Sequence, residues 1–260
     1  MADPLAIPGP EPIDEGPLAG AFRWTFEILT TESLTPQVRR LRLTAPHLEL
    51  LDARPGQDLM VAVPTDIGTG SDTEVATINR RYSIRSTEID GSEPHVVVDV
   101  VTHGAGPGAR WASTVEPGGI VRAVGPRGKV LVDDDARAHL FVGDAAGAPA
   151  TLSMLESVPM NGRALLIVDS VDQVQPTSAP EDRFRWLVGV APGAVDAELL
   201  AEVATDPAAI HAYLAGERRD VARWRALLLS AGLSSEQISP KAYWSRDASN
   251  AAHGEPARQG

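Results

Sequence analysis

The sequence changes its pattern once, at Asp133-Asp134-Asp135, and this change limits the folds open to the chain. Before it, short segments alternate apolar and polar residues and are separated by turns rich in Gly and Pro. After it, short apolar segments alternate with segments of helical periodicity. The first pattern predicts an antiparallel barrel or sandwich, and the second predicts a parallel sheet layered with helices. We therefore expect an antiparallel β domain followed by an α/β domain.

The periodicity also predicts where the elements and domains lie. Strands of the first domain are expected at residues 22–28, 38–43, 58–63, 82–86, 95–102 and 120–124. Strands of the second are expected at residues 139–142, 164–168, 185–188, 210–214 and 242–244, with helices after Pro149, at 195–203 and at 217–229. The expected domains are 21–133 and 136–246, with a flexible leader over 1–20 and a flexible tail over 247–260.

Composition excludes several classes of function. The chain has no cysteine, which removes thiol catalysis, iron–sulfur clusters and thiolate zinc sites. A formal charge of -12 argues against a general nucleic-acid binder, because phosphate contacts need clustered Lys and Arg. No apolar run approaches the roughly 20 residues of a membrane span, and the first residues do not resemble a signal peptide. The His and Asp spacings predict no metal site, and we expect a cytoplasmic protein.

The strongest local signal is Arg80-Arg81-Tyr82-Ser83. In a strand, Arg80 and Tyr82 share one face while Arg81 faces the other way. A guanidinium suits a pyrophosphate, an aromatic plane suits a stacked ring, and a hydroxyl can bond a ring nitrogen. These are the requirements of a bound flavin nucleotide. A plain exposed basic edge strand is the alternative that these residues leave open.

A Gly-rich segment follows, from His103-Gly104-Ala105-Gly106 through Pro107-Gly108-Ala109 to Trp111. A Gly-rich turn that opens a helix offers free backbone N–H groups to an anion, although alone it is a weak signal. Trp111 also suits a core position, and His103 suits an ordinary turn. Arg-x-Tyr-Ser, the Gly-rich turn, Pro117-Gly118 and Gly125-Pro126-x-Gly form an ordered set that is more specific than any member.

This ordered set resembles the siderophore-interacting proteins, a branch of the ferredoxin-NADP reductase superfamily. The likeness continues in Gly143-Asp144, which begins the segment that in the family reads Gly-Asp-Glu-Thr-Ala-Leu-Pro-Ala. It continues further in Tyr213-Leu214-Ala215-Gly216-Glu217 and in Ala242-Tyr243-Trp244. The resemblance covers roughly residues 22–246, nearly the whole expected folded part.

The resemblance implies a β-barrel that holds FAD and a cleft beside the α/β domain, where reduced flavin passes electrons to a ferric siderophore. By this likeness Tyr82 would stack on the isoalloxazine and Ser83 would lie near its N5, as the two catalytic residues. Other residues implied to contact a cofactor are Arg80, Val101, Thr102, His103, Gly106, Pro107, Gly108, Ala109 and Trp111 for FAD, and Gly143, Asp144, Gly216 and Glu217 for a nicotinamide. Lys241 and Arg246 are candidates for binding the anionic substrate, although Lys241 also suits a nicotinamide phosphate or a plain surface position.

The chain departs from the family pattern at two loops. Ala145-Ala146 stands where Glu-Thr is expected, which removes two polar groups that could orient a nicotinamide. The phosphate loop is one residue shorter, and Ala109 replaces a common hydroxyl residue. The departures predict poor use of NAD(P)H and leave a ferredoxin-like donor open. They also leave open a redox-silent protein that uses the pocket to cyclise or isomerise a natural product. We expect substrate specificity to come from loops 66–77 and 171–183.

Overall fold

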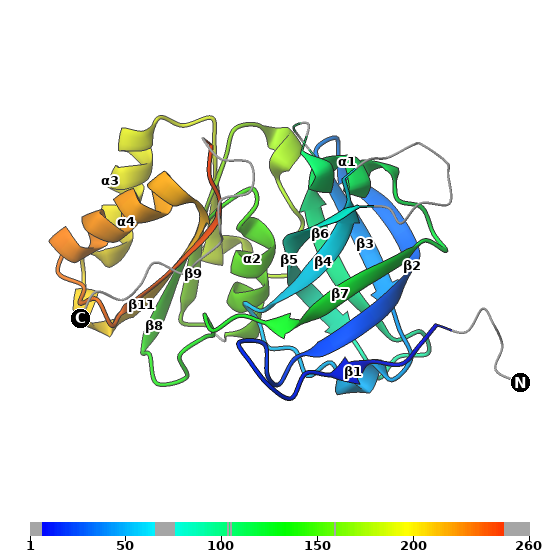
Figure 1. Ribbon diagram of the computed structural model, residues 1–260. Coiled ribbons are helices and arrows are strands. Elements are labelled where there is room, and N and C mark those ends of the chain that lie inside the picture. The colour runs from blue at the N-terminus through cyan, green and yellow to red at the C-terminus, as the bar shows by residue number, and fades with distance from the viewer. Residues whose placement is uncertain (1–6, 66–75, 103, 105, 159, 247–260) are drawn as a thin grey trace, which may run out of the picture. The chain divides into compact units, whose positions relative to one another are not determined.

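The computed structural model describes residues 7–65, 76–102, 104, 106–158 and 160–246. The chain forms two compact units that meet in sequence at Lys129 and Val130, a few residues before the expected boundary (Figure 1). Each unit has its own sheet and its own core. The predicted order, an antiparallel β domain and then an α/β domain, is confirmed.

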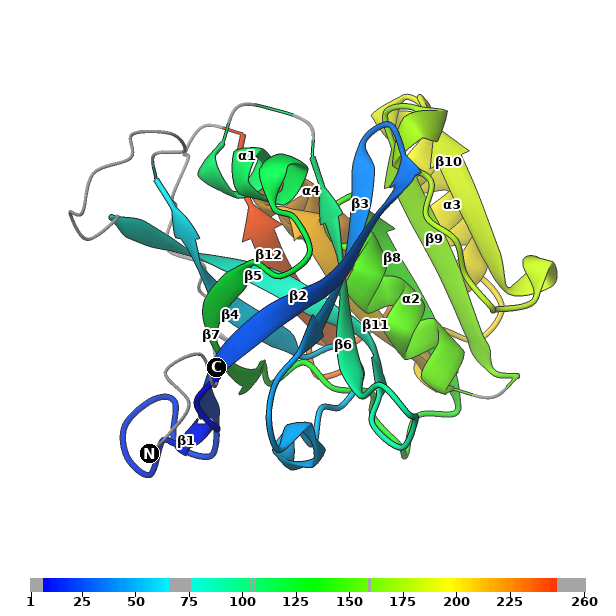
Figure 2. The ribbon, with the colours of Figure 1, turned by 90° about the vertical axis from the view of Figure 1, so that its right-hand side faces the viewer.

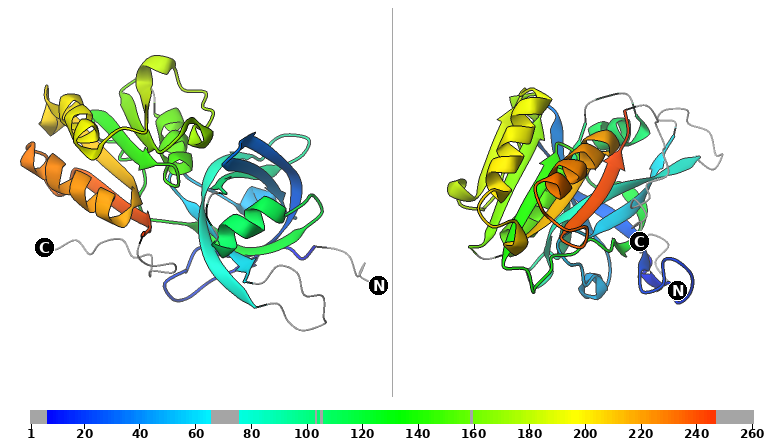
Figure 3. Two further views of the ribbon diagram at one scale, coloured as in Figure 1. Left: turned by 90° about the horizontal axis from the view of Figure 1, so that it is seen from above. Right: turned by 90° about the vertical axis from the view of Figure 1, so that its left-hand side faces the viewer.

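The first unit is a closed antiparallel barrel, as the family resemblance predicted. Its strands pair in the order β2-β3-β6-β5-β4-β7, and β2 pairs again with β7 to close the ring, which Figure 3 shows end-on. The strands are β2 (Phe22–Thr35), β3 (Val38–Thr44), β4 (Asp58–Pro64), β5 (Thr77–Glu88), β6 (His95–Val101) and β7 (Ile120–Arg127). Alternate residues of each strand point inward, so the apolar positions of the sequence pattern fill the barrel.

A short strand precedes the barrel. β1 (Glu11–Pro12) pairs antiparallel with Phe22 and Arg23 of β2, and the Ile13 backbone exchanges hydrogen bonds with Gly20 and Ala21. Ile13 is buried. The sequence predicted a flexible leader through residue 20 because this stretch lacks periodicity, and the pairing corrects that expectation for residues 11–13.

Among the described residues of the barrel unit there is one α-helix. α1 (Pro107–Thr114) begins in the Gly-rich segment and packs against β4 and β6. Its Trp111 and Ala112 are buried in the barrel core with Leu59, Val61 and Val98. The interpretation of Trp111 as a core residue is therefore confirmed. Figure 2 shows α1 beside the ends of the barrel strands.

The second unit is a five-stranded parallel sheet in the order β10-β9-β8-β11-β12. Its strands are β8 (Ala138–Asp144), β9 (Gly162–Val168), β10 (Phe184–Val188), β11 (Ile210–Glu217) and β12 (Ile238–Trp244). The helices between them are α2 (Ala148–Ser157), α3 (Pro192–Val203) and α4 (Arg218–Ser230). Parallel strands need such crossovers, which explains the alternation read from the sequence.

The two faces of this sheet bury different residues of the same strands. On β8, Leu140 and Val142 join the cluster under α3 and α4, where Trp224 is the largest side chain. Phe141 points the other way and packs with α2 and Tyr213. The carboxyl ends of β8, β11 and β12 consequently meet at one edge, where ligands bind in open α/β sheets.

The helices are short. The α-helices of the described ranges have eight to 13 residues. In the described part of the chain, no helix is long and apolar enough to cross a membrane.

Candidate functional site

The barrel brings together the Arg-x-Tyr pair of β5 and the start of α1. Tyr82 lies opposite Leu59 and Arg80 lies opposite Val61, so both face the side on which these two β4 residues are fully buried. Arg81 lies opposite Met60 on the other face. The strand alternation read from the sequence is confirmed, and Arg80 and Tyr82 share one face.

At Gly108 the backbone of α1 comes close to side chains of β5. A Cβ built on Gly108 would lie 2.7 Å from the Tyr82 hydroxyl and 3.3 Å from the Cγ of Arg80. Gly106 caps the helix in extended conformation, and Pro107 occupies the first turn. The first backbone N–H groups of α1 therefore lie beside Arg80, which is the arrangement expected of an anion-binding turn.

The Tyr82 ring also packs against the Trp111 ring. Their ring centroids are 5.6 Å apart, with 29° between the planes. The Tyr82 hydroxyl is buried and has no hydrogen-bond partner among the described residues. Burial raises the pKa of Tyr82, and the charge of Arg80 works in the opposite direction. A buried hydroxyl without a partner costs free energy unless a ligand supplies one.

These observations test whether the residues fit FAD. The close approach of the α1 backbone at Gly108, the unsatisfied Tyr82 hydroxyl and the adjacent guanidinium of Arg80 match the needs of a nucleotide with a pyrophosphate. The aromatic pair adds a rigid flat surface. The donor set of the barrel therefore fits the cofactor.

The other described residues that the sequence predicted in the barrel lie on β5, at the end of β6 and in α1. Ser83 alternates with Tyr82, is 3% exposed, and faces Asp58 across the β4–β5 ladder. Val101 pairs with Val38 at the end of β6, and the Thr102 N–H donates to Gln37 O at 2.8 Å. Ala109 is in the first turn of α1. His103 lies outside the described residues, so its expected cofactor contact stays a prediction.

In the second unit, Asp144 at the end of β8 holds the strand ends together. Its Oδ1 accepts from Gly147 N at 2.8 Å. Its Oδ2 accepts from Glu217 N at 2.8 Å and from Trp244 Nε1 at 2.7 Å. Burial raises the pKa of Asp144 above its usual value. These hydrogen bonds and one from Ala146 N–H act in the opposite direction without outweighing burial. The carboxylate is engaged in linking β8, β11 and β12.

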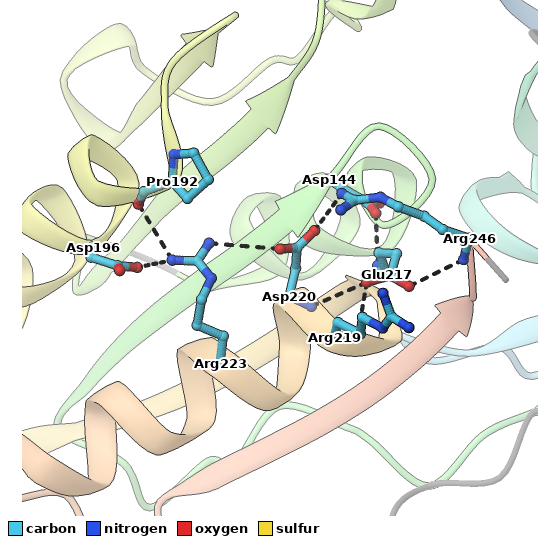
Figure 4. Close-up of polar contacts among 8 residues, drawn as sticks. All are labelled: Asp144, Pro192, Asp196, Glu217, Arg219, Asp220, Arg223 and Arg246. Carbon is cyan, nitrogen blue, oxygen red and sulfur yellow. Dashed lines mark hydrogen bonds and ion pairs between the residues drawn. The ribbon is translucent and has the colours of Figure 1, made fainter.

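Glu217 is engaged in the same way at the start of α4 (Figure 4). It is fully buried and caps the helix by accepting from Arg219 N at 2.7 Å and Asp220 N at 3.2 Å. Its other oxygen accepts from Arg246 N at 3.2 Å. Burial works to raise the pKa of Glu217, but these backbone donors and the Arg246 charge outweigh it and lower the pKa.

A chain of ion pairs extends this group along α4. Arg246 Nη2 donates to Asp220 Oδ2 at 2.7 Å, and Arg223 Nη2 lies 3.7 Å from Asp220 Oδ1. Arg223 also pairs with Asp196 of α3, as Figure 4 shows. Arg246, a candidate for substrate binding, is 58% exposed at its side chain and remains accessible in this arrangement.

Two glycines allow this close packing. A Cβ on Gly216 would lie 2.7 Å from the Asp144 carboxylate, and one on Gly143 would lie 2.5 Å from Thr151 Oγ1. The structure therefore places Gly143, Asp144, Gly216 and Glu217 together, as the sequence predicted. It gives both carboxylates internal hydrogen bonds, and their contact with a nicotinamide stays a prediction.

Lys241 is buried and does not occupy the plain surface position that the sequence left open. It is 4% exposed on β12, opposite Ala215, and its Nζ lies 5.0 Å from the Tyr243 ring centroid. A cation over an aromatic face is stabilised when it is partly removed from water. Its assignment to substrate binding stays a prediction.

Sequence reasoning missed Trp244 and Gln175 as parts of this edge. Gln175 is 1% exposed in loop 171–183 and its Nε2 donates to Ala145 O at 3.0 Å. It thus anchors the loop to the segment where the family has Glu-Thr. A glutamine in an aperiodic loop gives no sequence signal of such burial. Most of the other expected specificity loop, residues 66–75, lies outside the described residues.

Two family models match the two units. The model described as "Siderophore-interacting FAD-binding domain" matches residues 47–130, and the model "Siderophore-interacting protein" matches residues 136–247. The two matches follow each other along the chain and together cover most of it. The barrel is therefore an FAD-binding domain, and the fit of its residues to FAD agrees with this result.

Named relatives and a solved structure extend the comparison. The mycobactin import ATP-binding/permease protein IrtA of Mycolicibacterium smegmatis is 28% identical over 86% of this chain, which spans about a quarter (26%) of that protein. Ferric vibriobactin reductase ViuB of Vibrio cholerae is 28% identical over 68% of this chain and 66% of its own length. The crystal structure of a siderophore utilization protein from T. fusca superposes with a TM-score of 0.74 and 25% identity, over 91% of this chain and 97% of that one. The chain belongs to the siderophore-interacting protein family.

Proposed function

We propose that this protein is an FAD-dependent oxidoreductase that reduces ferric siderophores. The observation that carries the proposal is the group formed by Arg80, Tyr82, Gly108 and Trp111, which fits a flavin nucleotide within a domain matched by an FAD-binding family model. The relative ViuB is named a ferric vibriobactin reductase. A reduced flavin can release electrons one at a time, and this supplies the chemistry that a ferric ion requires.

Different residues of the barrel would bind different parts of FAD. Arg80 and the first N–H groups of α1 bind the pyrophosphate. Tyr82, whose ring packs on Trp111 and whose hydroxyl lacks a partner among the described residues, would hold the flavin through its ring and its hydroxyl. Ser83 lies near N5. In the second unit, Lys241 and Arg246 are the candidates for attracting an anionic chelate.

The strand ends of the second unit bear on the identity of the electron donor. The carboxylate oxygens of Asp144 and Glu217 already accept hydrogen bonds from backbone N–H groups and from Trp244. Ala145 and Ala146 have no polar side chain that could bind a nicotinamide. We infer that this edge binds NAD(P)H weakly and that a ferredoxin-like protein is the better donor. A cytoplasmic location, expected from the sequence, would give access to both donors.

Anaerobic absorbance spectra of the FAD-loaded protein test the donor. Slow bleaching by NADPH and NADH, with fast bleaching by a reduced ferredoxin, is the expected result. Bleaching by NADPH at the rate of turnover would overturn the donor assignment. Conversion of a natural product while the flavin stays oxidised would favour the redox-silent alternative and contradict the reductase.

A further inference from the structure

Three polar side chains form a row across β7, β4 and β5 of the barrel. Asp58 lies directly opposite Ser83 in the β4–β5 ladder and directly opposite Arg127 in the β4–β7 ladder. Residues directly opposite each other in antiparallel strands project from the same face, with Cβ atoms about 4.5–5.5 Å apart. Asp58 thus stands between a hydroxyl and a guanidinium.

Two members of the row are buried. Asp58 is 1% exposed and Ser83 is 3% exposed, whereas Arg127 is partly exposed. Asp is rarely buried unless it interacts with a partner. Leu59 and Val61 of β4 face inward and belong to the barrel core, so strand alternation puts Asp58 on the opposite, outer face. Its burial therefore points to a role on the outer face that it shares with Ser83.

The charge of Asp58 is balanced locally. Burial lowers the pKa of Arg127, the neighbouring charge of Asp58 raises it, and Arg81 lowers it again. Arg81 lies two residues before Ser83 and therefore on the same face. Asp58 consequently faces Arg127 and Arg81 as well as Ser83, and its negative charge is offset on this face of the barrel.

We propose that Asp58 is a positioning residue that accepts the Ser83 hydroxyl proton in a hydrogen bond and so presents the Ser83 oxygen as an acceptor. The inference rests on the proposed function, in which Ser83 lies near N5 of FAD. A hydroxyl has one hydrogen, so a Ser83 hydroxyl that donates to Asp58 can only accept from the cofactor. The N5 of a flavin carries a hydrogen when it is reduced and none when it is oxidised. Asp58 would then favour the reduced cofactor.

The proposed role of Asp58 and a simple charge effect predict opposite changes in the ratio of reduced to oxidised flavin. Loss of the acceptor weakens binding to the reduced flavin, so the reduced-to-oxidised ratio at a fixed applied potential falls, by about fivefold for one hydrogen bond of about 1 kcal/mol. If Asp58 acted only through its negative charge, its removal would stabilise the electron-rich reduced flavin and the ratio would rise.

The test is an equilibrium redox titration of the FAD-loaded protein with a double-mutant cycle. Asp58→Ala and Ser83→Ala should each lower the reduced fraction at the wild-type midpoint, and the double variant should match Ser83→Ala alone. Asp58→Asn keeps an acceptor oxygen and nearly the same shape, so it should stay close to wild type. The exposed Asp52→Asn is the matched control for loss of a surface carboxylate.

Three results would overturn the inference: a rise of the reduced fraction in Asp58→Ala, additive shifts in the double variant, or an equal effect of Asn and Ala. If Asp58→Ala does not fold, Ser83→Ala and Asp58→Asn still give two arms of the comparison. Failure here is distinguishable from failure of the proposed function, because the titration contains no iron. A wild-type protein that binds FAD and reduces a ferric chelate, with additive shifts, would refute only the role of Asp58.

Discussion

Gly108 and Tyr82 lie so close that no side chain fits between them: a Cβ on Gly108 would lie 2.7 Å from the Tyr82 hydroxyl. The contact joins the first turn of α1 to β5 and fixes where the helix N–H groups point relative to Arg80. A steric requirement at one glycine therefore links the Gly-rich turn to the Arg-x-Tyr strand.

Gly108→Ala tests this contact. The added methyl group must displace the Tyr82 hydroxyl or the start of α1, so we expect FAD affinity to fall about tenfold or more, equivalent to about 1.4 kcal/mol. Quenching of flavin fluorescence measures the affinity. Gly193→Ala at the start of α3 is the control, because a Cβ there meets nothing within 4 Å. Equal affinities in Gly108→Ala and wild type would show that the turn does not shape the site.

Tyr82→Phe separates folding from cofactor binding. The hydroxyl is buried without a partner among the described residues, so its removal should leave the stability of the FAD-free protein unchanged or raise it by up to about 1 kcal/mol. FAD affinity should fall about fivefold or more because the ligand loses its partner. Urea unfolding of the FAD-free protein and flavin titration measure the two effects. Equal destabilisation of both forms would contradict this assignment.

Asp144→Asn should destabilise the second unit. The amide of Asn turns one acceptor into a donor that faces the N–H groups of Gly147, Glu217 or Trp244, which costs about 2–3 kcal/mol. Trp244→Phe removes only the Nε1 donor and should cost about 1 kcal/mol. Chemical unfolding followed by circular dichroism gives both values. A stable Asp144→Asn protein with altered nucleotide binding would instead favour a direct role in the ligand site.

His139 predicts a pH dependence of stability. It is buried on β8, 5.9 Å from Phe141 between ring centroids, and burial lowers its pKa from 6.5, with His211 adding to this effect and Asp133 and Asp134 opposing it. A lowered folded-state pKa means that its contribution is present above pH 6.5 and is lost as pH falls through the folded value. His139→Phe should flatten this loss in urea unfolding between pH 8 and 5. An unchanged slope would assign the pH dependence to other groups.

Much of the fold could be predicted from the sequence because the two units differ in hydrophobic period. The alternation in β2 and β3 and the apolar strands β8 and β9 lie where the pattern placed them. β1 was missed because a two-residue strand is too short to show a period. Its pairing depends on the tertiary position of Phe22 and Arg23.

The candidate site could be predicted in part for a similar reason. Arg80, Tyr82 and Gly108 belong to local motifs whose spacing carries meaning, and the structure brings them together. The burial of Lys241 and the hydrogen bond from Trp244 to Asp144 depend on strand order in the sheet, which one sequence does not reveal. Asp58 was read only as the start of a strand, because its relation to Ser83 arises from cross-strand register.

The most direct test of the central claim is an anaerobic single-turnover experiment. The FAD-loaded protein is reduced photochemically and mixed with ferric siderophores of the catecholate and hydroxamate classes. Flavin absorbance and a dye that binds ferrous iron are recorded together. The proposed function predicts that oxidised flavin returns with two ferrous ions trapped per flavin, since the cofactor carries two electrons. Flavin that stays reduced in the presence of every ferric chelate would contradict it.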